Sequence, residues 1–182
     1  SMAQMSPDWT GPAPRVHTPE ITQRIGIDIN PIDATQPSGA ERLLAYLWPD
    51  QPDRIERTRA AIDLARHHPS QIVTADAAAW LETGLDALAP QGIVFLFHTI
   101  AWQYLPKDRQ AVGDAHIARV GAMRPSDAPL VRFAMEADGG VGAALTLTVW
   151  PGGTTIPLGR ADFHGRWVEW CTSDVFALGC DI

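Results

Sequence analysis

Positive charge is scarce in this chain of 182 residues. Lysine and arginine number 14 against 21 aspartates and glutamates, which gives a formal net charge of −7 at pH 7. Lys107 is the single lysine. Surfaces that bind nucleic acids carry clustered lysine and arginine. The charge balance therefore argues against a nucleic-acid partner.

Long apolar runs and cysteines are also few. No run approaches the roughly 20 residues that a membrane-spanning helix needs, and the N-terminus has no basic stretch followed by an apolar one. For the two cysteines, Cys171 and Cys180, a reduced pair is favoured over a disulfide. The six histidines lie in no metal-ligand spacing. We therefore expect a cytoplasmic protein with no metal and no membrane partner.

The composition of the chain divides it at about residue 20. Proline, glycine and polar residues dominate residues 1–20, which predicts an extended N-terminal arm. A hydrophobic content of 46% and a charged content of 19% are typical of globular proteins. Residues 21–182 are enough for one α/β domain with a substantial core.

The most informative stretch is the apolar run from Ile93 to Phe97, followed by His98 and Thr99. It is too short for a solitary helix and predicts a strand buried on both faces, as in a parallel sheet covered by helices. In open α/β sheets, ligands bind beyond the carboxyl ends of the strands. His98 and Thr99 are therefore expected at a binding cleft.

Strand and helix patterns alternate around this run. Strands are predicted at 21–29, 71–76, 93–97 and 129–136, and helices at 38–48, 54–67, 77–88 and 108–121. The segments 144–150, 154–161 and 166–170 then alternate between polar and apolar residues, which predicts an antiparallel meander. The order predicts an α/β fold with a mostly parallel sheet, helices on both faces and an antiparallel edge.

Acidic residues stand at the ends of two predicted strands. Asp28, with Asn30 beside it, lies near the carboxyl end of the first strand, and Asp76 ends the second. An acid near the carboxyl end of the first strand, where Asp28 lies, commonly binds ribose hydroxyls in nucleotide-binding folds. With equal weight, Asp28 or Asp33 simply caps the next turn or helix. The alternative for Asp76 is that it caps the helix that follows it.

His98 is the strongest catalytic candidate, because an imidazole can move protons near neutral pH. Trp102 and Tyr104 follow it and could form aromatic walls of a pocket. The alternative is that backbone hydrogen bonds fix His98 and that both aromatic side chains belong to the core.

Five blocks of sequence occur together and in order, and they resemble a bacterial family, domain of unknown function 2332. They are Arg24–Asp33, Trp48–Gln51, Phe97–Pro106, Leu147–Gly153 and Ala161–Trp167, and the resemblance covers about residues 8 to 170. It implies a Rossmann-like fold similar to that of S-adenosylmethionine-dependent methyltransferases. On that basis Asp28 would bind ribose hydroxyls and Asp76 adenine, with Asn30 and Thr99 as further cofactor contacts. His98 and Tyr104 would border the methyl acceptor.

The chain departs from this family at its N-terminus. Family members carry a Gly-rich strand and turn that would hold the methionine end of the cofactor, and nothing similar precedes Ile21. The resemblance therefore implies the C-terminal half of a longer member. We expect an assembly or interaction module without cofactor turnover of its own. The alternative is an S-adenosylmethionine-dependent methyltransferase, or half of one, acting on a small molecule. In a methyltransferase-like sheet the missing first strand would be central. The strands beside it would then have exposed edges, which predicts a homodimer.

Overall fold

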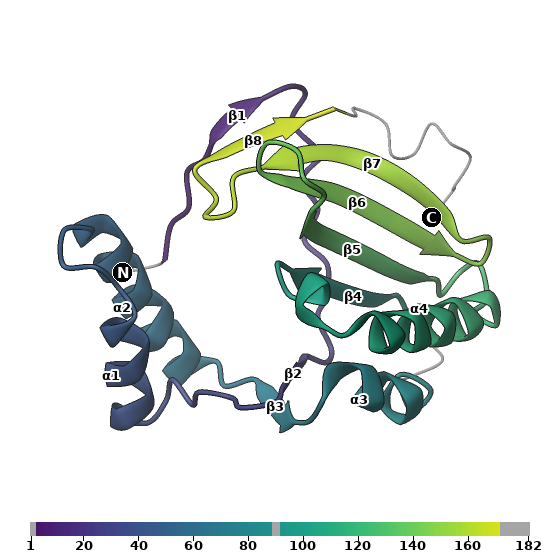
Figure 1. Cartoon of the computed structure of the whole chain (residues 1–182), viewed down its shortest axis with the longest axis horizontal. Helices are drawn as coiled ribbons and strands as arrows, with labels where there is room; N and C mark the ends of the chain where they lie inside the picture. The colour runs from purple at the N-terminus through teal and green to yellow at the C-terminus, as the bar shows by residue number, and fades with distance from the viewer. Residues whose placement is uncertain (1–2, 89–91, 172–182) are drawn as a thin grey trace. The chain divides into compact units, whose positions relative to one another are not determined.

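The computed structural model describes residues 3–88 and 92–171. The chain divides into two compact units (Figure 1). The first combines Ser1–Met5 with Thr18–Ala77, and the second combines Ser6–His17 with Ala78–Ile182. Each unit has a sheet of its own, with strands β2 and β3 in the first and with the order β1-β8-β7-β6-β5-β4 in the second.

The first unit pairs two short parallel strands and two helices. Proline stands in the first turn of both helices, where its fixed φ favours helix initiation and its missing N–H costs nothing. Its buried apolar residues are few and mostly small: Ala40, Ala60 and Ile62. The elements are β2 (Ile25–Asp28), α1 (Pro37–Ala45), α2 (Pro52–His67) and β3 (Gln71–Thr74).

The second unit is built on a curved sheet of six strands. β4 and β5 are parallel, β5 to β8 form an antiparallel meander, and β1 joins β8 in parallel. The N-terminal arm thereby closes one edge of the sheet, and Trp9 packs on Trp170 with ring centroids 5.7 Å apart. The strands are β1 (Asp8–Thr10), β4 (Val94–Thr99), β5 (Leu130–Ala137), β6 (Ala143–Trp150), β7 (Thr154–Ala161) and β8 (Trp167–Trp170).

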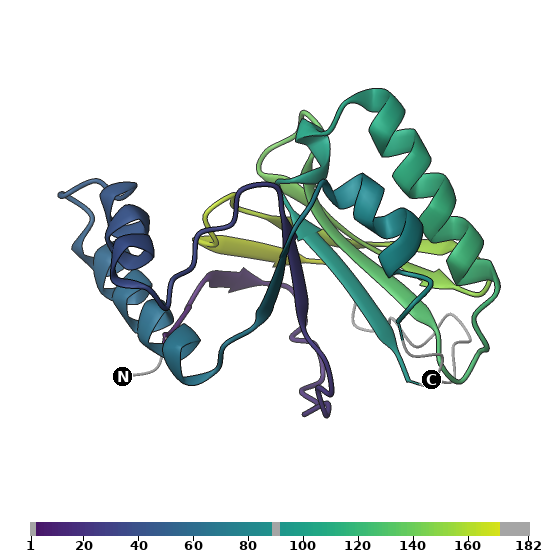
Figure 2. The same ribbon diagram turned by 90° about the horizontal axis from the view of Figure 1, so that it is seen from below.

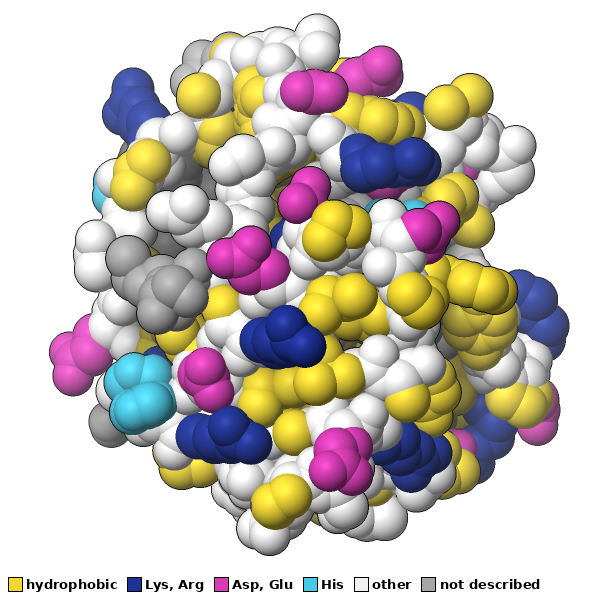
Figure 3. Space-filling view, turned by 90° about the vertical axis from the view of Figure 1, so that its left-hand side faces the viewer, with side chains coloured by type: hydrophobic (Ala, Val, Ile, Leu, Met, Phe, Trp, Pro, Cys, Tyr) yellow, Lys and Arg dark blue, Asp and Glu magenta, His cyan; other side chains and the backbone are white. Residues whose placement is uncertain are grey.

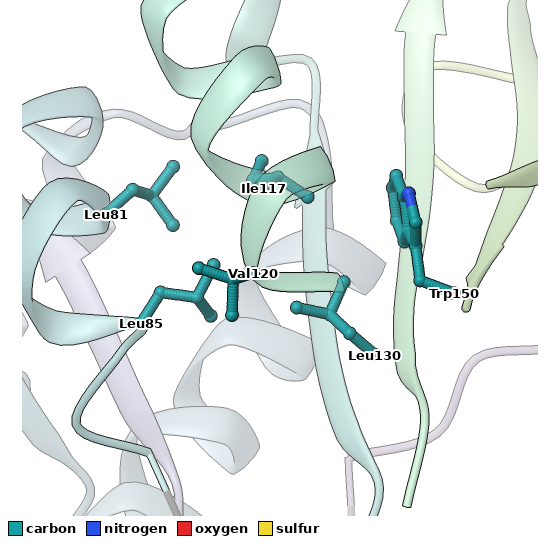
Figure 4. Close-up of a cluster of buried hydrophobic side chains, with 6 residues drawn as sticks. All are labelled: Leu81, Leu85, Ile117, Val120, Leu130 and Trp150. Atoms are coloured by element: carbon teal, nitrogen blue, oxygen red, sulfur yellow. The ribbon is translucent and has the colours of Figure 1, made fainter. Parts of the chain in front are cut away.

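Two helices cover one face of this sheet. Figures 1 and 2 show α3 (Ala77–Gly84) and α4 (Lys107–Ala122) on the same side of it. The core between them contains leucines from α3 and its C-terminal turn, Ile117 and Val120 from α4, and Leu130 and Trp150 from the sheet (Figure 4). Trp150 can lie close to α4 because residue 121 is a glycine, where an added Cβ would come within 2.4 Å of the indole ring.

A second apolar cluster lies on the opposite face of the sheet. It is centred on Leu145, Ile156 and Leu158, and side chains of β5 and β8 pack against it. The strands themselves supply this cluster, so the face of the antiparallel strands that α3 and α4 do not cover is apolar.

The predicted helices and strands are largely confirmed, but the predicted fold class is wrong. The sheet of the second unit is mixed and mostly antiparallel, with its described helices on one face, and is not a mostly parallel Rossmann-like sheet with helices on both faces. The physical reason is the chain after β5, which returns through hairpins instead of crossover helices. In addition, among the residues that the structure describes, β2 and β3 pair only with each other.

The prediction that the strand following Gly92 is buried on both faces is also wrong. Exposure alternates along β4, with Phe95 57% and Phe97 66% exposed while Val94, Leu96 and His98 are partly buried. A continuous apolar run is ambiguous in this respect, because hydrophobicity alone does not show whether a second layer covers the strand.

Candidate functional site

A polar network lies on the helix-covered face of the sheet, where β4 and β5 run side by side. The parallel register places His98 opposite Ala134. Side chains alternate along a strand, so Arg132 and Glu136, two residues to either side of Ala134, project from the same face. His98 lies between them, with 10% of its side chain exposed.

Both ring nitrogens of His98 have partners. Nδ1 lies 2.7 Å from Oε1 of Glu136, and Nε of Arg132 donates to Nε2 across 2.9 Å. The guanidinium only donates hydrogen bonds, so Nε2 must be the acceptor and the proton must reside on Nδ1. The network thus selects the neutral tautomer that donates to the carboxylate.

The pKa of His98 is lowered from its ordinary value of 6.5. Burial is the largest cause, and the charge of Arg132 lowers the pKa further, while the hydrogen bond with Glu136 opposes both. His98 is therefore held uncharged at neutral pH.

Glu136 binds the backbone of the turn that follows β4. Oε1 accepts hydrogen bonds from the N–H groups of Ala101 and Trp102 at 3.0 Å, and Oε2 accepts one from Gln103 at 3.3 Å. Such consecutive N–H groups form a concave anion site. The turn is sharp, since Ile100 has a φ of 48°, which is unusual for a branched side chain.

The pKa of the Glu136 carboxyl is lowered from its ordinary value of 4.5. Burial, the largest single cause, acts in the opposite direction, but the backbone donors and His98 together outweigh it. Glu136 is therefore an ionised, firmly positioned acceptor near neutral pH.

Trp102 closes the network on the helix side. It lies in the short 3-10 helix η1 (Trp102–Tyr104), where its ring stacks on His98 at 5.1 Å and lies 4.6 Å from the guanidinium carbon of Arg132. Gly113 in α4 leaves room for this ring, because a Cβ there would lie 2.7 Å from it. The cation–π contact and the stacking both favour one fixed geometry.

Two further side chains complete the network. Arg132 forms an ion pair of 2.8 Å with Asp114 on α4, and Gln103 Oε1 accepts a hydrogen bond from the N–H of Ala137. The strand pair, the turn and α4 are thus joined through one continuous set of polar contacts.

The chemistry of this arrangement is that of a fixed, neutral histidine. A proton can reach Nε2 only if Arg132 withdraws, so the ring presents no free lone pair in this conformation. The alternative considered from the sequence was a histidine fixed by backbone hydrogen bonds, but the two ring nitrogens contact side chains, those of Glu136 and Arg132. A catalytic role for His98 stays a prediction.

The other two candidates near β4 lie elsewhere. Thr99 is exposed and alternates with His98, so it projects from the opposite face of the sheet. Tyr104 ends η1 and is 75% exposed. The structure does not join either of them to the network, and their predicted roles stay untested.

The acidic candidates belong to the first unit. The Asp28 carboxylate accepts the Asn30 N–H at 2.8 Å, which is the local turn cap considered from the sequence. Asp76 is partly buried at the residue before α3 and has an interaction partner of its own. Cofactor binding by these three residues stays a prediction.

Arg132, Glu136 and Asp114 were not predicted as site residues from the sequence. A signal existed: Leu130, Arg132, Ala134 and Glu136 alternate, so two charged residues point toward the covered face of an otherwise apolar strand. A charge in that position needs a partner. The partner could not be identified before the β4–β5 register was known.

The described residues lack two further features. In that part of the chain, no cluster of three or more His, Cys, Asp or Glu side chains could hold a metal ion. None of its helices has the length and apolar character needed to cross a membrane. Cys171 is exposed and has a free thiol, and Cys180 lies outside the described residues.

The fold and the network define a small mixed α/β protein with a largely antiparallel main sheet and a histidine-centred polar network. The chain belongs to the family of uncharacterized proteins conserved in bacteria, domain of unknown function 2332, which matches residues 1–170. The resemblance seen in the sequence is thereby confirmed. No curated protein and no solved structure matches the chain.

Proposed function

We propose that this protein is an assembly module that forms a homodimer through the free edge of β4. The observation that carries the proposal is an unpaired strand edge with exposed aromatic side chains. In the described part of the chain, the strand order of the main sheet ends at β4, whose one neighbour is β5.

The exposed face of β4 is strongly apolar. Ile93, Phe95 and Phe97 are each more than half exposed. The two phenylalanine rings lie 6.0 Å apart, and Phe95 is 6.5 Å from Phe133 on β5. The aromatic row therefore continues the apolar cluster of the inner strands up to the edge of the sheet.

A second copy of the same strand is a suitable occupant of this edge. Two identical edges that pair in antiparallel fashion form a closed, two-fold symmetric interface, and residues 93–97 carry no charge that would meet its own copy. Soluble proteins usually protect such edges with charges, proline or a bulge, and β4 has none of these in its apolar run. Pairing would also bring the exposed phenylalanines of the two copies together.

The alternative prediction, methyl transfer from S-adenosylmethionine, depended on a methyltransferase-like sheet. The observed strand order removes that basis, and no contact in the His98 network favours the reaction. Assembly is therefore the function that the geometry supports better.

Sedimentation velocity over a range of protein concentrations tests the proposal. We expect a concentration-dependent dimer for the native chain, and a monomer for Phe97→Asp, because the new carboxylate would be buried in the interface. Phe163→Asp is the matched control, since Phe163 is an exposed phenylalanine in the turn after β7, and it should dimerise like the native chain.

Hydrogen exchange identifies the surface directly. The amides of residues 94–99 that face away from β5 should exchange more slowly as the protein concentration rises, whereas those of β7 should not change. A native chain that stays monomeric at about 100 μM, or a dimer that Phe97→Asp leaves intact, would contradict the proposal.

A further inference from the structure

The first unit contains a cavity of about 650 Å³ that is open to solvent. It lies between α2, the amino-terminal ends of β2 and β3, and the loop that follows β2. This volume is within the range of small-molecule sites, roughly 300–1,000 Å³. Figure 3 shows hydrophobic side chains among basic and acidic ones on one face of the molecule.

The greater part of the cavity lining is apolar. Ile32, Leu64 and Ile72 line it together with the small side chains of Ala61 and Ala65 on α2. Leu64 is 45% and Ile72 52% exposed, so apolar area faces the cavity instead of a packed core. An occupant with an apolar body would remove this area from water.

The polar side chains of the lining gather at one end. The β2–β3 register, which pairs Ile25 with Gln71, places Arg24 beside Ser70, and His68 lies two residues earlier. In the part of the chain that the structure describes, neither the Arg24 nor the His68 side chain has an ion-pair or hydrogen-bond partner. A cavity with an apolar wall thus has free donors where the two strands begin.

Among the described residues, the one acid of the lining already has partners. The Asp33 carboxylate accepts hydrogen bonds from the N–H and the hydroxyl of Thr35 at 2.9 and 2.6 Å. It closes its own turn, so it leaves the Arg24 guanidinium free for an external anion.

From these contacts we infer that the cavity binds a small carboxylic acid with an apolar body, with its carboxylate at Arg24 and its chain against Leu64 and Ile72. The guanidinium matches a carboxylate because its donors form a planar fork. Because the wall of the cavity is apolar, an unbranched alkyl chain is a suitable probe. This inference is independent of the proposed dimer, because β4 belongs to the other unit.

Titration of the full chain with octanoate, with octanol as the uncharged probe of equal length, tests the inference. Calorimetry should give a Kd below about 1 mM for octanoate and a value at least about 10-fold higher for octanol, since a charged hydrogen bond contributes about that factor. In ¹H–¹⁵N spectra, octanoate should shift the amides of Arg24, Ser70 and Ile72.

Two pairs of variants separate the head and tail of the ligand. Arg24→Gln should weaken the binding of octanoate about 10-fold without affecting the binding of octanol. Arg59→Gln, at an exposed position of α2 outside the lining, should leave the binding of both probes unchanged. Leu64→Ser should weaken the binding of both probes. Ile29→Ser changes an exposed isoleucine outside the lining and should affect the binding of neither. Equal binding of the two probes, no effect of Arg24→Gln, or amide shifts confined to other parts of the chain would overturn the inference.

Discussion

At the scale of single residues, His98 is defined by its neighbours. Glu136 accepts from one ring nitrogen, Arg132 donates to the other, and Trp102 covers the ring. Each partner has a second contact of its own, so the arrangement is a network in which the loss of one member leaves others buried without a partner.

We expect the His98 ring to titrate below pH 6.5, because burial lowers its pKa. As the pH falls through 6.5, the unfolded chain binds a proton before the folded chain does, so His98 contributes stability that is complete above that pH and is lost below it. NMR titration of the ring gives the pKa, and urea unfolding between about pH 7.5 and 5 gives the stability.

The variant His98→Phe keeps an aromatic ring against Trp102 and should reduce this pH dependence. His164→Gln changes an exposed histidine in the turn after β7. This variant should keep the pH dependence of stability of the native chain. A His98 ring that titrates at 6.5 or above would contradict the burial argument.

Glu136→Gln should lower the free energy of unfolding by about 1–3 kcal/mol. The amide of glutamine cannot accept all of the hydrogen bonds that the turn and His98 direct at the carboxylate, and it adds donors that lack acceptors. Urea denaturation measures the loss. Glu169→Gln on the exposed side of β8 is the control and should change stability by less than about 0.5 kcal/mol; an equal loss in both variants would mean that the turn is held by other contacts.

At the scale of secondary-structure elements, α4 depends on glycines that let tryptophans approach its backbone. Gly113 contacts Trp102 and Gly121 contacts Trp150, both without room for a methyl group. Glycine normally weakens a helix by roughly 1 kcal/mol relative to alanine. Its two positions in α4 are explained by close packing against the turn and the sheet.

Gly113→Ala should therefore destabilise the protein, against the usual direction for a helical glycine. We expect a loss of about 1–3 kcal/mol, typical of overpacking, measured by thermal or urea unfolding. The double variant Gly113→Ala with Trp102→Phe should recover part of it, because a phenyl ring is smaller than an indole. An independent, additive effect of the two changes would show that the Cβ and the indole do not collide.

At the scale of the whole molecule, net charge opposes the self-association that we propose for the β4 edge. Two chains of −7 repel each other, whereas the apolar run 93–97 contributes no charged contacts. Salt screens repulsion over a Debye length of about 10 Å at 0.1 M. The Kd of the dimer should therefore fall a few-fold when NaCl rises from about 20 to about 300 mM. Sedimentation equilibrium measures this, and a dimer that dissociates as salt rises would indicate an interface of ion pairs instead.

The local structure of this chain was largely determined by its sequence. The three- and four-residue spacing of apolar residues and the polar–apolar alternation of 144–150 are short-range signals, so helices and hairpin strands were predicted near their observed positions. The family resemblance was likewise carried by local blocks.

The tertiary structure alone decided which strands pair and which side chains meet. Pairing depends on contacts between distant residues, and local periodicity does not specify them; the parallel sheet predicted from the alternating order was replaced by a meander and a separate β2–β3 pair. His98 was visible in the sequence as a polar residue at a strand end, but Arg132, Glu136 and Asp114 became its network only through the β4–β5 register and the packing of α4. Exposure of Phe95 and Phe97 has the same origin, because a side chain's burial depends on what the rest of the fold places over it.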